Sequence, residues 1–142
     1  MTEQGRARVA ALDVGDVRVG VAIADELGLL VAGIGVVRRV GGVHDLEAIG
    51  KLLSPHAPTQ LVVGLPLNMD GSEGPQATKT RRFAERVATH LGLPLAFQDE
   101  RLSSFEAEER LRAAGITGTG RRAKLDQIAA VVILEDFLAR GR

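Results

Sequence analysis

The first third of the chain alternates short apolar runs with tight polar turns. A Gly-Asp pair at residues 15–16 separates the first two runs, which is typical of a β-hairpin. Gly33 and Gly35 in the third run indicate a bulge or a close packing contact. The pattern therefore predicts a three-stranded antiparallel meander, with strands at residues 9–12, 17–24 and 29–37.

Beyond residue 40 the pattern changes to alternating helices and strands. Short apolar runs predict two further strands, and right-handed crossovers make these parallel to the first strand. The fold class is therefore α/β: a five-stranded mixed sheet flanked by helices, with no internal repeat or linker, so that residues 1–142 form one domain. The predicted helices span residues 43–53, 76–91, 103–114 and 124–140, and the predicted strands span residues 61–65 and 93–97.

Two connecting segments have their own signals. Ser103 and Glu106 have the spacing of a capping box that opens the third helix. Residues 64–75 form a loop with three glycines and Asn68, whose backbone donors are suited to a phosphate, although the segment is not a P-loop. Residues 115–123 form a Gly/Arg loop before the last helix.

Composition narrows the chemistry. The 18 basic and 18 acidic side chains give no net charge, which excludes binding of nucleic acid by bulk positive charge. The absence of Cys excludes disulfides, thiolate metal sites and a cysteine nucleophile, and three scattered His residues argue against a His-rich metal site. With no Tyr or Trp, a wall of stacked aromatic side chains is not expected either. No run of about 18 apolar residues and no signal-peptide core are found, so no membrane association and a cytoplasmic location are expected.

Two acidic residues stand at strand ends. Asp13 ends the first buried strand, and Glu100 follows the last strand. Ligands of open α/β sheets collect beyond the carboxyl ends of parallel strands, so both carboxylates are expected at the same edge. Either residue alone would more simply be a turn residue, but the pairing favours a ligand site.

A third acidic residue lies on the last helix, which is apolar on nearly every side. At 100° per residue, Asp126 shares a face with Ala130, Ile133 and Phe137. A buried carboxylate there needs a partner, because an unpaired buried charge is costly. The simpler explanation is a first-turn Asp that interacts with the helix dipole.

Three converging carboxylates without a nearby His or Cys point to Mg²⁺ or Mn²⁺ bound through oxygen. Two such ions roughly 3.5–4 Å apart activate water and stabilise the leaving oxygen in phosphodiester cleavage. Arg18 and Lys124 are placed to bind phosphate. Two basic groups accompany them: residues Arg121, Arg122 and Lys124, flanked by glycines, and, as weaker evidence, residues Lys79, Arg81, Arg82 and Arg86 on a helix face that is more simply a solvated one.

Four segments together resemble one family. ALDVGDVRVGVAIAD, VVGLPLNMDGSEGPQA, FQDERLSSFEAEERL and KLDQIAAVVILEDFL match, in order, the motifs of the YqgF/RuvX family between residues 9 and 138. Members are described as Holliday junction resolvases or pre-16S rRNA nucleases with a ribonuclease H-like fold, which implies the strand order 3-2-1-4-5. The resemblance implies a metal-binding, catalytic triad of Asp13, Glu100 and Asp126. It also implies roles around the site for Arg18, Arg101, Ser103 and Lys124, and for the loop with Asn68.

The chain departs from the family in its first motif. The usual Asp-Tyr/Phe-Gly-x-Lys-Arg is replaced by DVGDVR at residues 13–18, without the aromatic residue and the lysine. This departure concerns substrate contacts of the hairpin and leaves the triad intact. A fourth metal carboxylate is not identifiable, with Asp16 and Asp99 as the candidates.

The leading hypothesis is a nuclease that uses two Mg²⁺ or Mn²⁺ ions on structured nucleic acid, at the 5′ end of precursor 16S rRNA or at a Holliday junction. One alternative is a non-catalytic RNA-binding factor in ribosome assembly. Another is a phosphotransferase of the sugar kinase and actin type, which would need a second domain. A symmetric homodimer would match the two-fold symmetry of a junction, with Leu65, Leu67 and Met69 as exposed interface candidates.

Overall fold

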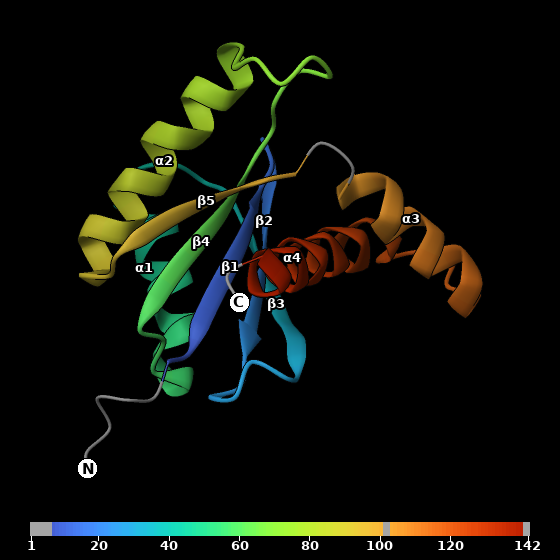
Figure 1. Ribbon diagram of the computed structural model, residues 1–142, viewed down its shortest axis with the longest axis horizontal. Helices are drawn as coiled ribbons and strands as arrows, with labels where there is room; N and C mark the ends of the chain where they lie inside the picture. The colour runs from blue at the N-terminus through green and yellow to red at the C-terminus, as the bar shows by residue number, and fades with distance from the viewer. Residues whose placement is uncertain (1–6, 101–102, 141–142) are drawn as a thin grey trace.

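A single mixed sheet forms the centre of the molecule (Figure 1). The computed structural model describes residues 7–100 and 103–140. The first three strands pair antiparallel, and the last two run parallel to β1, which confirms the predicted order β3-β2-β1-β4-β5. The strands are β1 (Val9–Val14), β2 (Arg18–Ala24), β3 (Val31–Arg38), β4 (Gln60–Leu65) and β5 (Leu95–Asp99).

Helices cover both faces of the sheet (Figure 1). Helices α1 and α2 pack on one face, and α4 crosses the other face. Helix α3 packs on α4 and projects away from the sheet. None of the described helices combines the length and apolar character that crossing a membrane requires. The helices are α1 (Gly42–Leu53), the short 3-10 helix η2 (Ser54–His56), α2 (Pro75–Leu91), α3 (Ser103–Ala114) and α4 (Arg121–Arg140).

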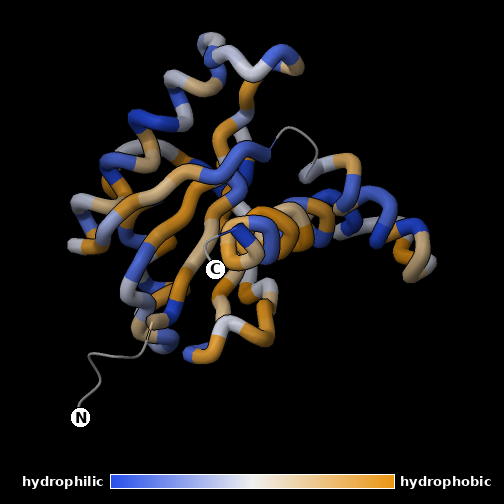
Figure 2. The backbone as a smooth tube through the Cα atoms, in the orientation of Figure 1, coloured by the Kyte–Doolittle hydropathy of each residue, from blue (hydrophilic) through white to orange (hydrophobic). Residues whose placement is uncertain are grey.

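Strand alternation divides the core into two layers. Figure 2 shows the apolar strands in the middle of the molecule and a largely hydrophilic α2 outside them. On β1, Leu12 packs toward α1 and α2, whereas Ala11 packs toward α4. Because successive strand residues point to opposite faces, Asp13 lies on the α4 side and Val14 on the α2 side. The end of β1 therefore contributes to two different surfaces, one on each face of the sheet.

Glycines in β2 and β3 allow α4 to pack closely against the sheet. A Cβ atom at Gly20 would lie 2.0 Å from the carbonyl oxygen of Asp126, and one at Gly33 would lie 2.3 Å from Cγ of Gln127. The pairing of β2 with β3 shifts register between Val21 and Ala22, opposite the segment 33–35. The close packing and the bulge expected from the glycines are both confirmed.

The last helix begins three residues earlier than predicted. The amide of Arg121 donates to the Gly118 carbonyl, and that of Lys124 donates to the Gly120 carbonyl. Arg121 and Arg122 therefore belong to the first turn of α4 and not to a loop. Asp126 lies in the second turn, so its explanation as a first-turn residue was wrong. Residues 121–123 lack apolar periodicity but are good helix formers, which is why the pattern missed them.

A buried carboxylate organises the loop before α1. Asp45 is 2% exposed, and its carboxylate accepts the amides of Val40 at 2.8 Å and Gly41 at 3.1 Å, with Nε of Arg39 at 3.7 Å. We expect Asp45→Asn to lower the free energy of unfolding by about 1–2 kcal/mol, because the amide cannot accept with both ends. Urea unfolding at pH 7 measures this. Glu47→Gln, an exposed change in the same helix, should stay within about 0.5 kcal/mol, and equal effects of the two would contradict the role.

Candidate active site

The three predicted acidic residues lie at the carboxyl edge of the parallel strands. Asp13 is the penultimate residue of β1, Glu100 directly follows β5, and Asp126 lies on α4, which crosses above them. Asp13 pairs with Gly20 across the hairpin, and Gly20 is the residue on which the Asp126 backbone rests. The fold thus brings together residues that are up to 113 positions apart in the chain.

The position of Glu100 at this edge depends on a backbone hydrogen bond and on the absence of a side chain at Gly64 of β4. Its amide donates to the Leu65 carbonyl at 3.2 Å. A Cβ atom at Gly64 would lie 3.0 Å from Cβ of Glu100 and 2.5 Å from Cδ1 of Ile133. Gly64 therefore makes the space into which the Glu100 side chain enters beside α4.

Asp13 and Glu100 form a partly buried carboxyl pair, in which each group affects the pKa of the other. Burial raises the pKa of Asp13 well above its usual range, and the neighbouring Glu100 and Asp126 charges raise it further. Burial also raises the pKa of Glu100. Two neighbouring carboxyls that are shielded from water need either a shared proton or a bound cation.

The third carboxylate is engaged elsewhere. Nε of Arg18, the first residue of β2, lies 2.6 Å from Oδ2 of Asp126, and both side chains are largely buried. Within residues 7–100 and 103–140, no three Asp, Glu or His side chains are already gathered as a metal site. Asp126 is therefore beside the Asp13–Glu100 pair but bonded to Arg18.

The donor set fits a divalent cation. Asp13 and Glu100 offer carboxylate oxygens, the ligands that Mg²⁺ and Mn²⁺ prefer, without sulfur or imidazole donors. Among the residues that the structure describes, no Lys or Arg forms an ion pair with either. A bound cation would supply the missing positive charge.

Ser103 supports Glu100 and does not form the predicted capping box. Its hydroxyl lies 3.0 Å from the Glu100 carbonyl oxygen and 3.3 Å from Oε1 of Glu100, and its own amide donates to the same carbonyl. Ser103 is the first residue of α3, and its buried hydroxyl contacts Glu100, so the predicted capping box was wrong. Arg101 lies outside the described residues.

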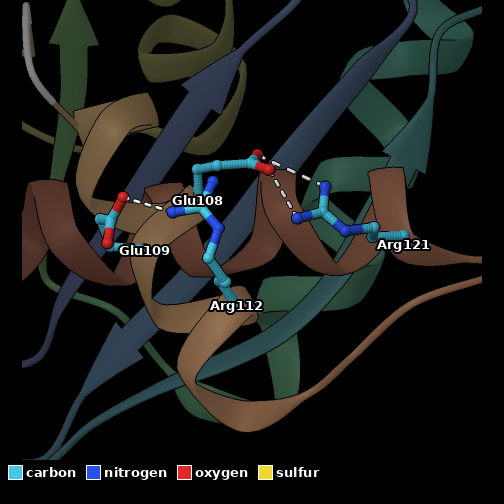
Figure 3. Close-up of polar contacts among 4 residues, drawn as sticks. All are labelled: Glu108, Glu109, Arg112 and Arg121. Atoms are coloured by element: carbon cyan, nitrogen blue, oxygen red, sulfur yellow. Dashed lines mark hydrogen bonds and ion pairs between the residues drawn. The ribbon is translucent and has the colours of Figure 1, made fainter.

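The basic group at the start of α4 is divided in the structure. Arg121 forms a two-pronged ion pair with Glu108 of α3, while Arg112 pairs with Glu109 (Figure 3). The charge of Arg121 is thus compensated by α3. The exposed side chains of this group are those of Arg122 and Lys124.

The loop after β4 is held by its own side chains. Nδ2 of Asn68 donates to Oγ of Ser72 at 2.9 Å, and the Asn68 amide donates to the Ser72 carbonyl at 2.8 Å. Asn68 is exposed. Leu65 is only 5% exposed, so the expectation that it is an exposed interface residue was wrong, whereas Met69 is 75% exposed.

Two residues that shape the site were not singled out from the sequence. Gly20 and Gly64 carry no chemistry, yet each makes room for one carboxylate-bearing segment. An isolated glycine inside an apolar strand is the available signal, because it marks a close approach of another part of the chain.

Comparisons with known proteins agree with this architecture. The family model described as "RuvX: Holliday junction resolvase" matches residues 7–140. A relative from Anaeromyxobacter dehalogenans, named "Putative pre-16S rRNA nuclease", is 47% identical over 133 residues, which cover 94% of this chain and 97% of that protein. A relative of the same name from Myxococcus xanthus is 45% identical and covers 95% of this chain and 89% of its own length.

A solved structure has the same fold. "T. thermophilus RuvC in complex with Holliday junction substrate" superposes with a TM-score of 0.54 at 15% sequence identity, covering 95% of this chain and 96% of that one. At this identity the likeness shows a shared ribonuclease H-like fold. The family match and the identity to the two bacterial relatives, each extending over more than nine-tenths of the chain, show that the protein belongs to the YqgF/RuvX family.

Proposed function

We propose that the protein is a metal-dependent nuclease that hydrolyses phosphodiester bonds in structured nucleic acid. The observation that carries this proposal is the partly buried Asp13–Glu100 pair, which has no ion-pair partner among the described residues. Such a pair lowers the stability of the fold when both groups are ionised. A non-catalytic RNA-binding factor would have no use for it, whereas a cation-binding site requires it.

The roles of the side chains follow from their positions. Asp13 and Glu100 hold the cations, and Asp126 completes the ligand set when it leaves Arg18. Ser103 fixes the orientation of Glu100. Two Mg²⁺ or Mn²⁺ ions, when bound, lower the pKa of a water molecule and neutralise the charge on the leaving oxygen.

Basic side chains near this edge hold the substrate backbone. Arg18, once released by Asp126, offers a planar guanidinium to a phosphate oxygen. Lys124 and Arg122 lie exposed at the start of α4, and Arg121 beside them is tied to α3. We propose that these residues, together with Arg101 and Asn68, contact nucleic acid.

The proposed substrate is precursor 16S rRNA. Relatives at 45–47% identity carry names that refer to this RNA, while the structure with a Holliday junction is 15% identical. The test compares a precursor rRNA fragment, a four-way DNA junction and linear DNA at the same Mn²⁺ concentration. We expect preferential cleavage of the rRNA fragment. Cleavage of the junction alone would overturn the substrate assignment, and no metal-dependent cleavage of any would overturn the nuclease.

Arg18 is expected to compete with the cation for Asp126. Arg18→Gln frees the Asp126 carboxylate and removes a nearby positive charge, so Mn²⁺ should bind several-fold more tightly, as measured by calorimetry. Cleavage at saturating Mn²⁺ should nevertheless fall about tenfold, because a phosphate contact is lost. Arg38→Gln, at the exposed neighbouring position on β3, is the control and should change neither. Weaker Mn²⁺ binding by Arg18→Gln would contradict the competition.

A further inference from the structure

A basic cleft lies at the end of β1, on the face of the sheet opposite to the side chain of Asp13. It has a volume of about 510 Å³ and opens between the tip of the β1–β2 hairpin, the loop before α1 and the first turns of α2. Val14 lines it, while the preceding Asp13 belongs to the α4 side of the sheet. The side chains that matter to its chemistry are Arg39, Lys79, Thr80, Arg82, Phe83 and Arg86.

Three cations of the cleft form no ion pair with any residue that the structure describes. Lys79, Arg82 and Arg86 recur at a spacing of three and four on α2, so they share one face of the helix. In the described part of the chain none of them pairs with a carboxylate. Arg81, on the same helix but outside the cleft, is paired with Glu73 at 2.6 Å. Among the Lys and Arg residues of α2, those that line the cleft are thus the ones without an ion pair in the described part of the chain.

Two contacts of Arg39 form one wall of the cleft. Cζ of Arg39 lies 4.3 Å from the centre of the Phe83 ring, and Nη1 of Arg39 donates to the Gly15 carbonyl at 2.8 Å. Asp45, one of the two acids in the lining, is occupied by the loop amides before α1. The other acid, Asp16, is exposed at the hairpin tip. The charge available to a ligand is therefore positive.

The residues that line the cleft include a buried polar group without a hydrogen-bond partner in the described part of the chain. The Thr80 hydroxyl is buried and has no hydrogen-bond partner among the described residues. A buried hydroxyl without a partner destabilises a fold, so it is expected where a ligand or its water provides the missing bond.

We propose that this cleft is a second phosphate site, which holds the phosphodiester backbone of the substrate on the α2 side of the hairpin tip. This inference rests on the proposed nuclease function. A strand whose scissile bond lies at Asp13 need only pass over residues 15–17 to reach Lys79 and Arg82, because adjacent residues of β1 face the two sites. The cleft and the carboxylates would then bind one nucleic-acid strand on the two sides of the β1–β2 hairpin.

The test measures binding without cleavage. A fluorescein-labelled 20-nucleotide single-stranded RNA is titrated against the full chain carrying Asp13→Asn, in Mg²⁺ and at several salt concentrations. Adding Lys79→Gln should weaken binding about three- to tenfold and reduce the salt slope by about 0.7. Adding Arg82→Gln with Arg86→Gln should reduce the slope by about twice that amount.

Lys51→Gln is the matched control, since Lys51 is exposed on α1 outside the cleft and the charge change is identical. It should alter RNA affinity less than about twofold, as a general charge effect would. Equal effects of Lys51→Gln and Lys79→Gln, or none from either, would overturn the proposal. It would also be overturned if inorganic phosphate raised the Tm in a Lys79-dependent way while RNA affinity stayed unchanged, because the cleft would then hold a free phosphate.

The two proposals fail separately. Loss of RNA affinity in Lys79→Gln, in a protein whose wild type cleaves nothing, would support the cleft and overturn the nuclease. Thr80→Val gives an independent readout: Tm should rise by about 2–4 °C, because an unpaired hydroxyl is removed, while RNA affinity falls about threefold. A stabilised Thr80→Val that binds RNA like its parent would overturn the part assigned to this hydroxyl.

Discussion

Asp13→Asn should abolish cleavage while the protein stays folded and still binds nucleic acid. The amide cannot replace a carboxylate as a ligand for a divalent cation, and loss of about 4 kcal/mol of transition-state stabilisation slows hydrolysis about a thousandfold. Initial rates on the precursor rRNA fragment at saturating Mn²⁺ measure the effect. Asp136→Asn is the control, since Asp136 lies ten residues beyond Asp126 on α4, roughly 15 Å away, and should keep activity within about twofold.

The same variant should be more stable than the metal-free wild type. The pKa of Asp13 is raised in the folded state, mainly by burial and then by Glu100, so the folded protein holds protons that the unfolded chain has released. Wild-type stability therefore falls as the pH rises above about 4, where an unfolded Asp titrates, toward the raised pKa. Asp13→Asn lacks this loss, so its advantage should grow toward neutral pH in thermal unfolding.

Added Mn²⁺ should reverse the order of stability of the wild type and Asp13→Asn. Binding to the folded state raises the Tm of the wild type, and Asp13→Asn gains little. Normal turnover by Asp13→Asn would contradict the mechanism. A variant that is inactive but also less stable at neutral pH would contradict the assignment of Asp13 as an uncompensated buried acid.

Gly20→Ala should have the largest effect on stability of any single methyl group added to this protein. The new Cβ would lie 2.0 Å from the carbonyl oxygen and 2.5 Å from the carbonyl carbon of Asp126, both of them backbone atoms of α4. Backbone cannot turn aside as a side chain can, so the helix must shift. We expect a loss of about 3 kcal/mol or more in the free energy of unfolding, at the upper end for overpacking.

Gly50→Ala is the matched comparison. Its Cβ would meet only Cδ2 of Leu91, at 3.2 Å, and this flexible side-chain end can move. Because Gly50 lies inside α1, where alanine is the better helix former, the change should be neutral or slightly stabilising. Denaturant midpoints of both variants decide the matter. A Gly20→Ala protein as stable as Gly50→Ala would mean that α4 does not rest on β2 in solution.

The sheet and its order could be predicted because each strand has a strong local pattern. β4 is apolar at nearly every position because both of its faces are buried, and the β1–β2–β3 meander has turn residues at its ends. The placement of Asp13 and Glu100 followed from the same signals, since both residues stand at strand ends. For these parts local sequence and tertiary structure agree.

The parts that were missed depend on long-range partners. Arg18 and Asp126 are 108 residues apart in the chain, and neither has a local feature that indicates their ion pair. The first turn of α4 is linked to α3 by the ion pair of Arg121 with Glu108. Because this contact is polar, the residues of that turn show no apolar periodicity from which a helix could be predicted. The cleft at α2 combines three segments, and basic residues on one helix face did not by themselves distinguish a binding surface from a solvated one.

The attachment of α3 has a consequence for dynamics. This helix buries only Ser103, Ala107 and Leu111, and charged pairs such as Arg110–Glu135 link it to α4. Salt screens such exposed pairs, so α3 should open locally at a lower free energy than the sheet and exchange its amide hydrogens earlier. Because Ser103 at its first turn contacts Glu100, each opening would also release this side chain, which we propose binds the metal. Ionic strength is therefore expected to act on the proposed nuclease through its own outer helix as well as through its nucleic-acid substrate.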